Sequence, residues 1–219
     1  MCFSAEADLV AGAVVTAVGV DAFRQARRPA ERPLGALPVL LGAHLLVEAL
    51  VWQGLTGDVD PSVGRQAMWI YLAFALLVLP VLVPVAIRAV EPDPGRRRTM
   101  AHLAAVGIAL ALVYLVGLLQ GPVTVRIEGN HLAYQLGMDH GGLLAGVYAI
   151  VACAPPMLSS ERRIAGFGLA NLAAVVVLVW IQSSALTSLW CAWAAVASVA
   201  IAAYLRRVNR QPEVRVHLL

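Results

Sequence analysis

The sequence contains no lysine, since all 16 of its basic residues are arginine, and only 13% of its residues are charged. A typical soluble domain carries about a quarter charged residues. The absence of lysine excludes a retinal-type pigment, which needs a lysine amine for its Schiff base. The scarcity of charge, together with 60% hydrophobic residues, predicts an integral membrane protein.

Cysteine is also scarce, with Cys2, Cys153 and Cys191 as its only representatives. No pair has CxxC spacing, which argues against a thiol-disulfide relay or a zinc ribbon. Cys2 and Cys191 are both expected near the same membrane face. A disulfide or a shared ligand role is therefore open for them, beside simple packing as small apolar residues.

What the chain has in abundance is long apolar runs, each close to the roughly 20 residues with which a helix crosses about 30 Å of hydrocarbon. Because a backbone in lipid must satisfy its own hydrogen bonds, these runs are expected to be helices. The predicted fold is all-α: a polytopic protein of the plasma membrane, with one seven-helix domain over 1–206 and a cytoplasmic tail over 207–219. The seven predicted spans are 5–25, 34–55, 66–90, 99–120, 140–159, 163–183 and 186–206.

The arginines predict the orientation of these spans. Fourteen of the 16 follow the first, third, fifth and seventh runs, and only Arg65 and Arg126 lie on the other side. Because basic residues favour the cytoplasmic face, the N-terminus is expected outside and the C-terminus in the cytoplasm. The basic charge therefore reports topology, and no nucleic-acid partner is expected.

The longest connection between runs, "TVRIEGNHLAYQ" (124–135), alternates apolar and polar residues around a Glu-Gly-Asn turn. This pattern predicts a β-hairpin, with an irregular loop as the alternative. A lone hairpin is marginally stable, so it is expected to rest on the outer helix ends as a lid. Pro80 and Pro84 inside the third run are expected to bend that helix and to free carbonyl groups that need other partners.

The second run carries the most unusual polar pattern, "GAHLLVEALVW" (42–52), in which His44, Glu48 and Trp52 recur every fourth residue and share one helix face. Glu48 lies about seven residues, or roughly 10 Å, below the outer end of the run. A carboxylate at that depth costs on the order of 2.5–3.5 kcal/mol, so it is expected to face the bundle interior or a wet cavity. Other polar and aromatic residues of the outer half predict a mostly apolar, aromatic-lined pocket around Glu48.

Four chemical roles are compatible with this pattern. Burial favours the neutral form of a carboxyl, so Glu48 could donate a proton to an alkene, with aromatic faces stabilising the resulting cation. His44, Glu48 and His140, with Cys2 or Glu6, could instead bind a metal. His44 and Glu48 could also relay protons in a carrier, or simply bond each other and fix helix packing.

Four stretches resemble a family of small seven-helix actinobacterial membrane proteins marked by an MCFS start: "MCFSAEADLVAGAVV", "LPVLLGAHLLVEALVW", "HLAYQLGMDHGG" and "SLWCAWAA". That family is similar to the bacterial membrane-bound terpene cyclases of drimentine-type indole sesquiterpenoid biosynthesis. The resemblance implies proton-initiated cyclisation of a farnesyl chain attached to an indole or diketopiperazine, with no metal, no cofactor and no loss of diphosphate. A lipophilic prenylated molecule and the bilayer are then the expected partners.

The resemblance also implies roles for particular residues. The related fungal meroterpenoid cyclases have a catalytic Glu on the second helix, which Glu48 matches, and an Asp on the last helix, which has no counterpart here. We therefore expect Glu48 to donate the proton and His44 to orient or recharge it. The expected second acid or base is Glu6, Asp139 or His140, and the residues expected to shield the cation are Trp52, Tyr71, Trp180 and Trp190. The competing class is a metal-dependent membrane hydrolase or a proton-coupled carrier that uses His44 and Glu48.

Overall fold

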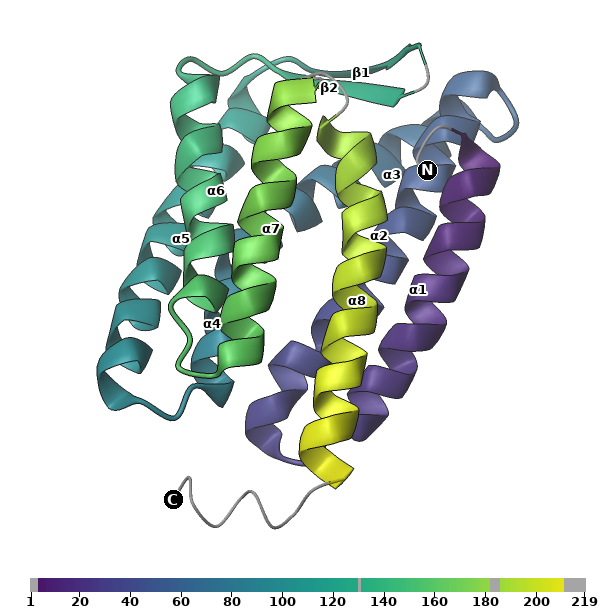
Figure 1. Ribbon diagram of the computed structural model, residues 1–219. Helices are drawn as coiled ribbons and strands as arrows, with labels where there is room; N and C mark the ends of the chain where they lie inside the picture. Colours follow the sequence, from purple (N-terminus) through teal and green to yellow (C-terminus); the bar gives the residue numbers. More distant parts are fainter. Residues whose placement is uncertain (1–3, 130, 182–185, 211–219) are drawn as a thin grey trace.

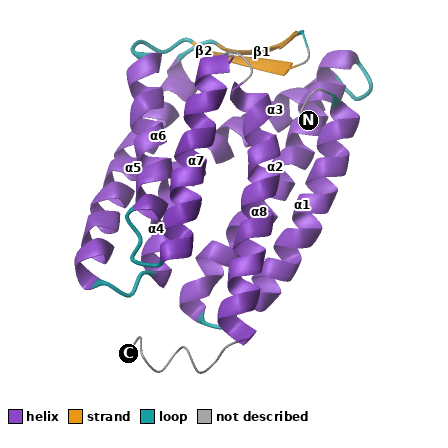
Figure 2. Cartoon of the chain, viewed as in Figure 1, coloured by secondary structure: helices purple, strands orange, loops and turns teal. Residues whose placement is uncertain are grey.

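The computed structural model describes residues 4–129, 131–181 and 186–210, without the side chains of 178–194 and 210. The described chain is mostly helical, with a two-stranded hairpin laid across one end of the helices (Figures 1 and 2). The elements are α1 (Ala5–Gln25), η1 (Pro29–Glu31), α2 (Arg32–Thr56), α3 (Pro61–Ala73), η2 (Phe74–Val78), α4 (Leu79–Val90), α5 (Pro94–Gln120), β1 (Val123–Glu128), β2 (His131–Leu136), α6 (Gly141–Met157), α7 (Arg162–Ile181) and α8 (Leu186–Arg210).

The helices follow the apolar runs of the sequence closely. Three described helical segments are long and apolar enough to cross a bilayer, and α6 is apolar but only 17 residues long. Seven spans, and their direction through the membrane, therefore remain a prediction. The three long apolar segments are Pro29–Thr56, Pro61–Val90 and Pro94–Gln120.

Several helices begin before the apolar run because a polar residue caps them. The carboxylate of Asp60 accepts a hydrogen bond from the Ser62 N–H at 2.8 Å, and the carboxylate of Asp93 accepts one from the Arg96 N–H at 2.7 Å. In both cases a proline occupies the next position, where its missing N–H costs nothing. These caps extend α3 and α5 by a turn or more beyond the predicted spans.

Glycines bring α1 and α2 into close antiparallel contact. A Cβ atom added at any of three glycines would lie less than 3.0 Å from an atom of the other helix, a distance that real Cβ atoms essentially never show. Small residues of this kind let helix backbones approach closely, which is a common way of packing helices in membranes. The touching pairs are Gly12 with Leu46, Thr16 with Gly42, and Gly19 with Val39.

The predicted third run forms a continuous helix interrupted by one π-helical segment, η2, between α3 and α4. Within η2 the Leu79 N–H bonds to the carbonyl of Phe74, five residues back. The next residue, Pro80, has no N–H to give to Ala75. The Tyr148 hydroxyl of α6 donates to the Ala75 carbonyl at 2.9 Å instead. The expectation that the prolines free a carbonyl needing another partner is confirmed at this position.

The predicted hairpin is confirmed. β1 and β2 pair antiparallel from Val123 with Leu136 to Glu128 with His131, and Gly129 in the turn has a positive φ of 59°. The apolar side chains of one hairpin face join a buried cluster with α2 and α3, in which Leu132 is only 1% exposed. We call the end of the bundle that the hairpin covers the hairpin end. Its role as a lid remains a prediction.

The opposite end, where α1 and α4 end and α8 reaches Arg210, carries most of the arginines, and we call it the arginine end (Figure 1). Two buried glutamates, Glu31 and Glu91, each accept hydrogen bonds from the loops at this end. Glu31 accepts hydrogen bonds from the Arg27 N–H at 3.0 Å, from Arg28 Nε at 2.7 Å and from Asn209 Nδ2 of α8 at 3.2 Å. We call this set the Glu31 clamp, and it joins the α1–α2 loop to α8.

Glu91 forms a second clamp between the α4–α5 and α6–α7 loops. It accepts hydrogen bonds from Ser159 Oγ at 2.8 Å and from the Ser160 N–H at 2.9 Å, and also from the Ser160 hydroxyl. Burial by itself raises the pKa of Glu91, but the hydrogen bonds from Ser160, Ser159 and backbone N–H groups outweigh it and hold the pKa below the ordinary value of 4.5. The clamp is therefore built around a charged carboxylate.

Glu91→Gln is expected to lower the thermal stability of the protein in a pH-dependent way. Because the pKa of Glu91 is lower in the folded chain, its stabilisation is complete well above pH 4.5 and is lost as the pH falls toward the folded pKa. The difference in unfolding midpoint between wild type and variant should be largest at neutral pH and should shrink below pH 4.5. Glu128→Gln, which removes an exposed ion pair with Arg126, is the control with little expected effect. A Glu91 effect that stays constant with pH would contradict this assignment.

Candidate functional site

Glu48 lies inside the bundle near the hairpin end, as its cost in lipid predicts, and only 1% of it is exposed. It is carried by α2, with His44 one turn toward the arginine end and Trp52 one turn toward the hairpin end. Trp52 is 5% exposed, and its indole Nε1 has no hydrogen-bond partner in the described part of the chain. An acid and an indole thus share one buried helix face.

A stack of three rings covers the neighbouring space. The imidazole of His44 lies parallel to the ring of Tyr71 on α3, with centroids 4.0 Å apart and an angle of 12°. The opposite partner of Tyr71 is Tyr134 of β2, at 4.8 Å and 10°. Phe74 of η2 also contacts His44, at 4.8 Å and 45°. The stack ties α2, α3 and the hairpin together beside Glu48.

This geometry bears on the role expected of Tyr71. We predicted that its ring shields a cation, but His44 and Tyr134 stack on it. A ring that stacks on two others has less free face to offer a further group. The shielding role of Tyr71 and of Trp52 stays a prediction. The side chains of Trp180 and Trp190 lie outside the described residues.

His44 is held by ring contacts rather than by hydrogen bonds among the described residues. Stacking with Tyr71 fixes the plane of its imidazole. The position of His44, one turn from Glu48, agrees with an orienting role. The ring stack alone would also explain why a histidine lies on this helix face, without any catalytic role for it.

Asp8 of α1 is a second buried acid at this level of the bundle, with 0% exposure. It lies on the face of α1 that carries Gly12 and Gly19, which contact α2. The antiparallel register of those glycine contacts puts Asp8 level with Leu50, two residues or about 3 Å along the axis from Glu48. The structure thus brings two buried carboxyl groups to one level of the α1–α2 pair.

The sequence does contain a signal for Asp8. Asp8, Gly12, Val15 and Gly19 recur at intervals of three or four residues, so the acid belongs to the same face as the small packing residues. Tyr134, by contrast, carried no such signal, because its contact with Tyr71 joins a strand to a helix far away in the chain.

The three residues predicted as the second acid or base are all exposed. Glu6 lies in the first turn of α1, and Asp139 and His140 lie before α6 in a shallow surface groove with Gly117 and Met138. α6 packs mainly on α4, α5 and α7. The role of these three residues as second acid or base stays a prediction, and the buried acid that the register places closest to Glu48 along the helix axis is Asp8.

The cavity that the described residues enclose is not the predicted pocket around Glu48. It lies toward the arginine end, between α2, α4, α6, α7 and α8, and has a volume of about 330 Å³. Its upper limit is formed by Leu41, Leu79 and Tyr148, and Leu41 is three residues below His44 on α2. Apolar periodicity predicted which faces turn inward, but not where short side chains leave space.

The metal-site alternative finds no ligand cluster in the described part of the chain, where no three His, Cys, Asp or Glu side chains gather. His140 lies at the start of α6, away from the α1–α2 pair. Cys153 is buried and free, and accepts a hydrogen bond from Asn171 Nδ2 at 3.2 Å. The predicted pairing or shared ligation of Cys2 and Cys191 lies outside the described residues.

Comparison with known proteins identifies a family but not an activity. The chain belongs to a family of unknown function, DUF6629, whose model matches residues 1–216. No curated protein and no solved structure matches the chain.

Proposed function

We propose that this member of DUF6629 is an integral membrane terpene cyclase, which protonates the terminal alkene of a prenylated substrate with Glu48. The observation that carries the proposal is the pair of buried carboxyl groups, with Glu48 1% and Asp8 0% exposed in a bundle of apolar helices. Burying a charged carboxylate in lipid is costly, and two carboxyls at one level cannot both be ionised cheaply. In the proposed mechanism Glu48 therefore keeps its proton until it donates it to the substrate.

The exposed apolar side chains support a membrane location, as does the length of the apolar helices. Besides the three long apolar segments, the outer faces of α1 and α5 expose large apolar side chains, a distribution that suits a lipid environment and not water. In the proposed topology all seven long helical segments cross the plasma membrane. The hairpin end faces outward, and the arginine end faces the cytoplasm.

The proposed reaction is an isomerisation that conserves atoms. The proton of Glu48 forms a C–H bond with one end of the terminal alkene and leaves a carbocation at the other end. A neighbouring alkene of the same chain attacks that cation and closes a ring, and the last cation loses a proton to a base. Glu48, now a carboxylate, regains a proton from solvent, and Asp8 relays that proton to it.

The surroundings of Glu48 fit such a step. Trp52 offers an indole one turn away, and an aromatic face stabilises a nearby cation by about 0.5–2 kcal/mol. The His44–Tyr71–Tyr134 stack has a positioning role, because its ring contacts hold α2 and α3 together one turn from Glu48. The DUF6629 chain would then need neither a metal nor a diphosphate leaving group to start the reaction.

Deuterium incorporation tests the proposal directly. Membranes containing the protein are incubated in D₂O with a farnesylated indole and, separately, with a farnesylated diketopiperazine. Proton initiation predicts a cyclised isomer that carries one non-exchangeable deuterium, because the added proton comes from exchanged Glu48 and stays on carbon. Membranes without the protein are the control. A cyclised product without deuterium, or no protein-dependent conversion of either substrate, would refute the proposal.

A further inference from the structure

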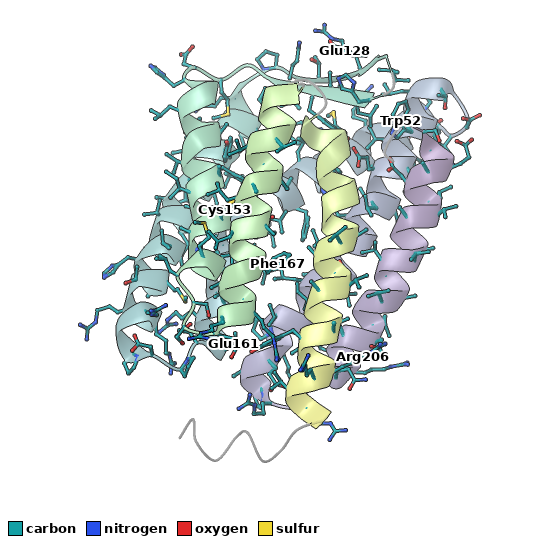
Figure 3. The ribbon with its side chains drawn as sticks, viewed as in Figure 1. Trp52, Glu128, Cys153, Glu161, Phe167 and Arg206 are labelled. Carbon is teal, nitrogen blue, oxygen red and sulfur yellow. The ribbon has the colours of Figure 1, made fainter. Side chains whose placement is uncertain are left out.

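The cavity near the arginine end is apolar along most of its length and basic at the end toward the loops. Its walls are almost entirely apolar, with branched aliphatic residues of α2 and α4 and small residues of α8 among the lining. Ala197, Ala200 and Ile201 recur along α8 at the spacing of one helix face. The alanines leave the space that leucines at the same positions would fill. Phe167 of α7, labelled in Figure 3, also lines the cavity.

The end of the cavity toward the loops is different. Arg163, in the first turn of α7, and Arg207, in the last turn of α8, line it together with Tyr204. Both arginines are exposed, and neither forms an ion pair with any residue in the described part of the chain. By contrast, their neighbours Arg28 and Arg206 are paired, with Glu31 and Asp21.

We infer that this cavity binds an amphiphile with one hydrocarbon chain and a phosphate headgroup. The chain would occupy the apolar part, whose volume of about 330 Å³ is at the low end of ligand pockets and suits one chain rather than two. The headgroup would lie between Arg163 and Arg207, because guanidinium groups bind phosphate oxygens through paired hydrogen bonds. Two arginines also match the charge of a phosphate, about −1.5 to −2, better than that of a carboxylate.

Acidic residues near the mouth oppose this arrangement. Glu161, which precedes α7, and Glu31 both lie within electrostatic range of Tyr204, as do Arg163 and Arg28. Glu31 forms an ion pair with Arg28, so Glu161 is the acid that the test addresses. It repels an anion at the mouth, whereas the two arginines attract it. The three charged residues therefore make predictions of opposite sign for the same ligand.

Native mass spectrometry of the protein released from a neutral detergent measures the binding, with dodecyl phosphate as the probe. We expect one molecule per chain. The double variant Arg163→Gln/Arg207→Gln should raise the half-saturating concentration by about tenfold or more, since a hydrogen bond to a charged group is worth that much. Glu161→Gln should lower it. Arg162→Gln, which removes a neighbouring arginine that does not line the cavity, is the matched control and should change it less than about twofold.

Two cavity-filling variants on opposite walls, Ala200→Phe on α8 and Ala152→Leu on α6, should each weaken binding, so that misfolding of one leaves the other informative. Dodecanol and inorganic phosphate should each bind at least about tenfold more weakly than dodecyl phosphate. If dodecanol bound as tightly as dodecyl phosphate, the arginines would have no role in binding the headgroup. Equal binding by a two-chain phosphatidic acid would replace the single-chain ligand with a bilayer lipid. Binding insensitive to both fillers would place the ligand elsewhere.

This inference does not depend on the cyclase chemistry, because it concerns other residues and a different measurement. Glu48 and Asp8 do not line the cavity. Loss of cyclisation in a Glu48 variant with intact dodecyl phosphate binding, or the reverse, therefore separates the two proposals.

Discussion

Glu48→Gln is expected to reduce cyclisation of the prenylated substrate by about a thousandfold, within the range that a positioned general acid contributes. Glutamine keeps the shape of the side chain but has no acidic proton to donate. The same variant should be as thermally stable as the wild type or more stable, because a neutral amide costs less to bury in an apolar bundle than an acid that can ionise. Product formation and the unfolding midpoint are measured on the same preparation.

Two further acid variants separate the candidate partners of Glu48. Asp8→Asn should lose about a hundredfold in rate, because in the proposed mechanism this second buried carboxyl relays the proton that restores Glu48. Glu6→Gln, on the same helix but exposed, should stay within about twofold of wild type. Full activity of Glu48→Gln would refute its role as donor. An effect of Glu6→Gln as large as that of Asp8→Asn would return the partner role to Glu6.

Gly19→Ala is expected to have the largest effect on stability. A Cβ at this position would lie less than 3.0 Å from backbone atoms of Pro38 and Val39, which cannot rotate away. α1 must then move off α2, at a cost of about 3 kcal/mol, the upper end of ordinary overpacking. The free energy of unfolding, or the thermal midpoint in detergent, measures this loss. Activity should fall as well, because the displacement carries Asp8 away from Glu48.

Gly166→Ala is the matched control for Gly19→Ala. Gly166 is also inside a helix, α7, but a Cβ there would meet no atom within 4 Å. The gain in helix propensity, up to about 1 kcal/mol, is common to both substitutions, so the difference between them reports helix packing alone. Equal stabilities of the two variants would show that α1 and α2 do not pack through Gly19.

Hydropathy predicted the helical segments well and their ends less well. The predicted ranges for α1 and for the beginning of α8 coincide with those observed. α5 begins at Pro94 and not near residue 99, because Asp93 caps a turn that carries three arginines. An apolar window cannot detect a polar first turn, whereas a Pro preceded by Asp can reveal it. The π-helical segment η2 depends on the position of Pro80 and on a hydroxyl from α6, so no local pattern predicts it.

The part of the candidate site that could be predicted is the part whose position depends only on the free-energy cost of exposing a polar group to lipid. An acid in the middle of an apolar helix must be buried, and Glu48 is. The residues around it were harder to predict. The position of Asp8 relative to Glu48 depends on the α1–α2 register, and the contact of Tyr134 with Tyr71 depends on how the hairpin packs on the helices. The cavity depends on the sum of side-chain volumes across five helices, which periodicity does not measure.

The two glutamate clamps have a mechanical consequence for the molecule. The Glu31 clamp joins α8 to the α1–α2 loop, and the Glu91 clamp joins the α4–α5 loop to the α6–α7 loop. The two clamps thus join different loops of the arginine end, and helices held by each of them line the cavity, with Arg163 on α7 and Arg207 on α8. Because no residue belongs to both clamps, loss of one clamp should leave the loops held by the other still joined.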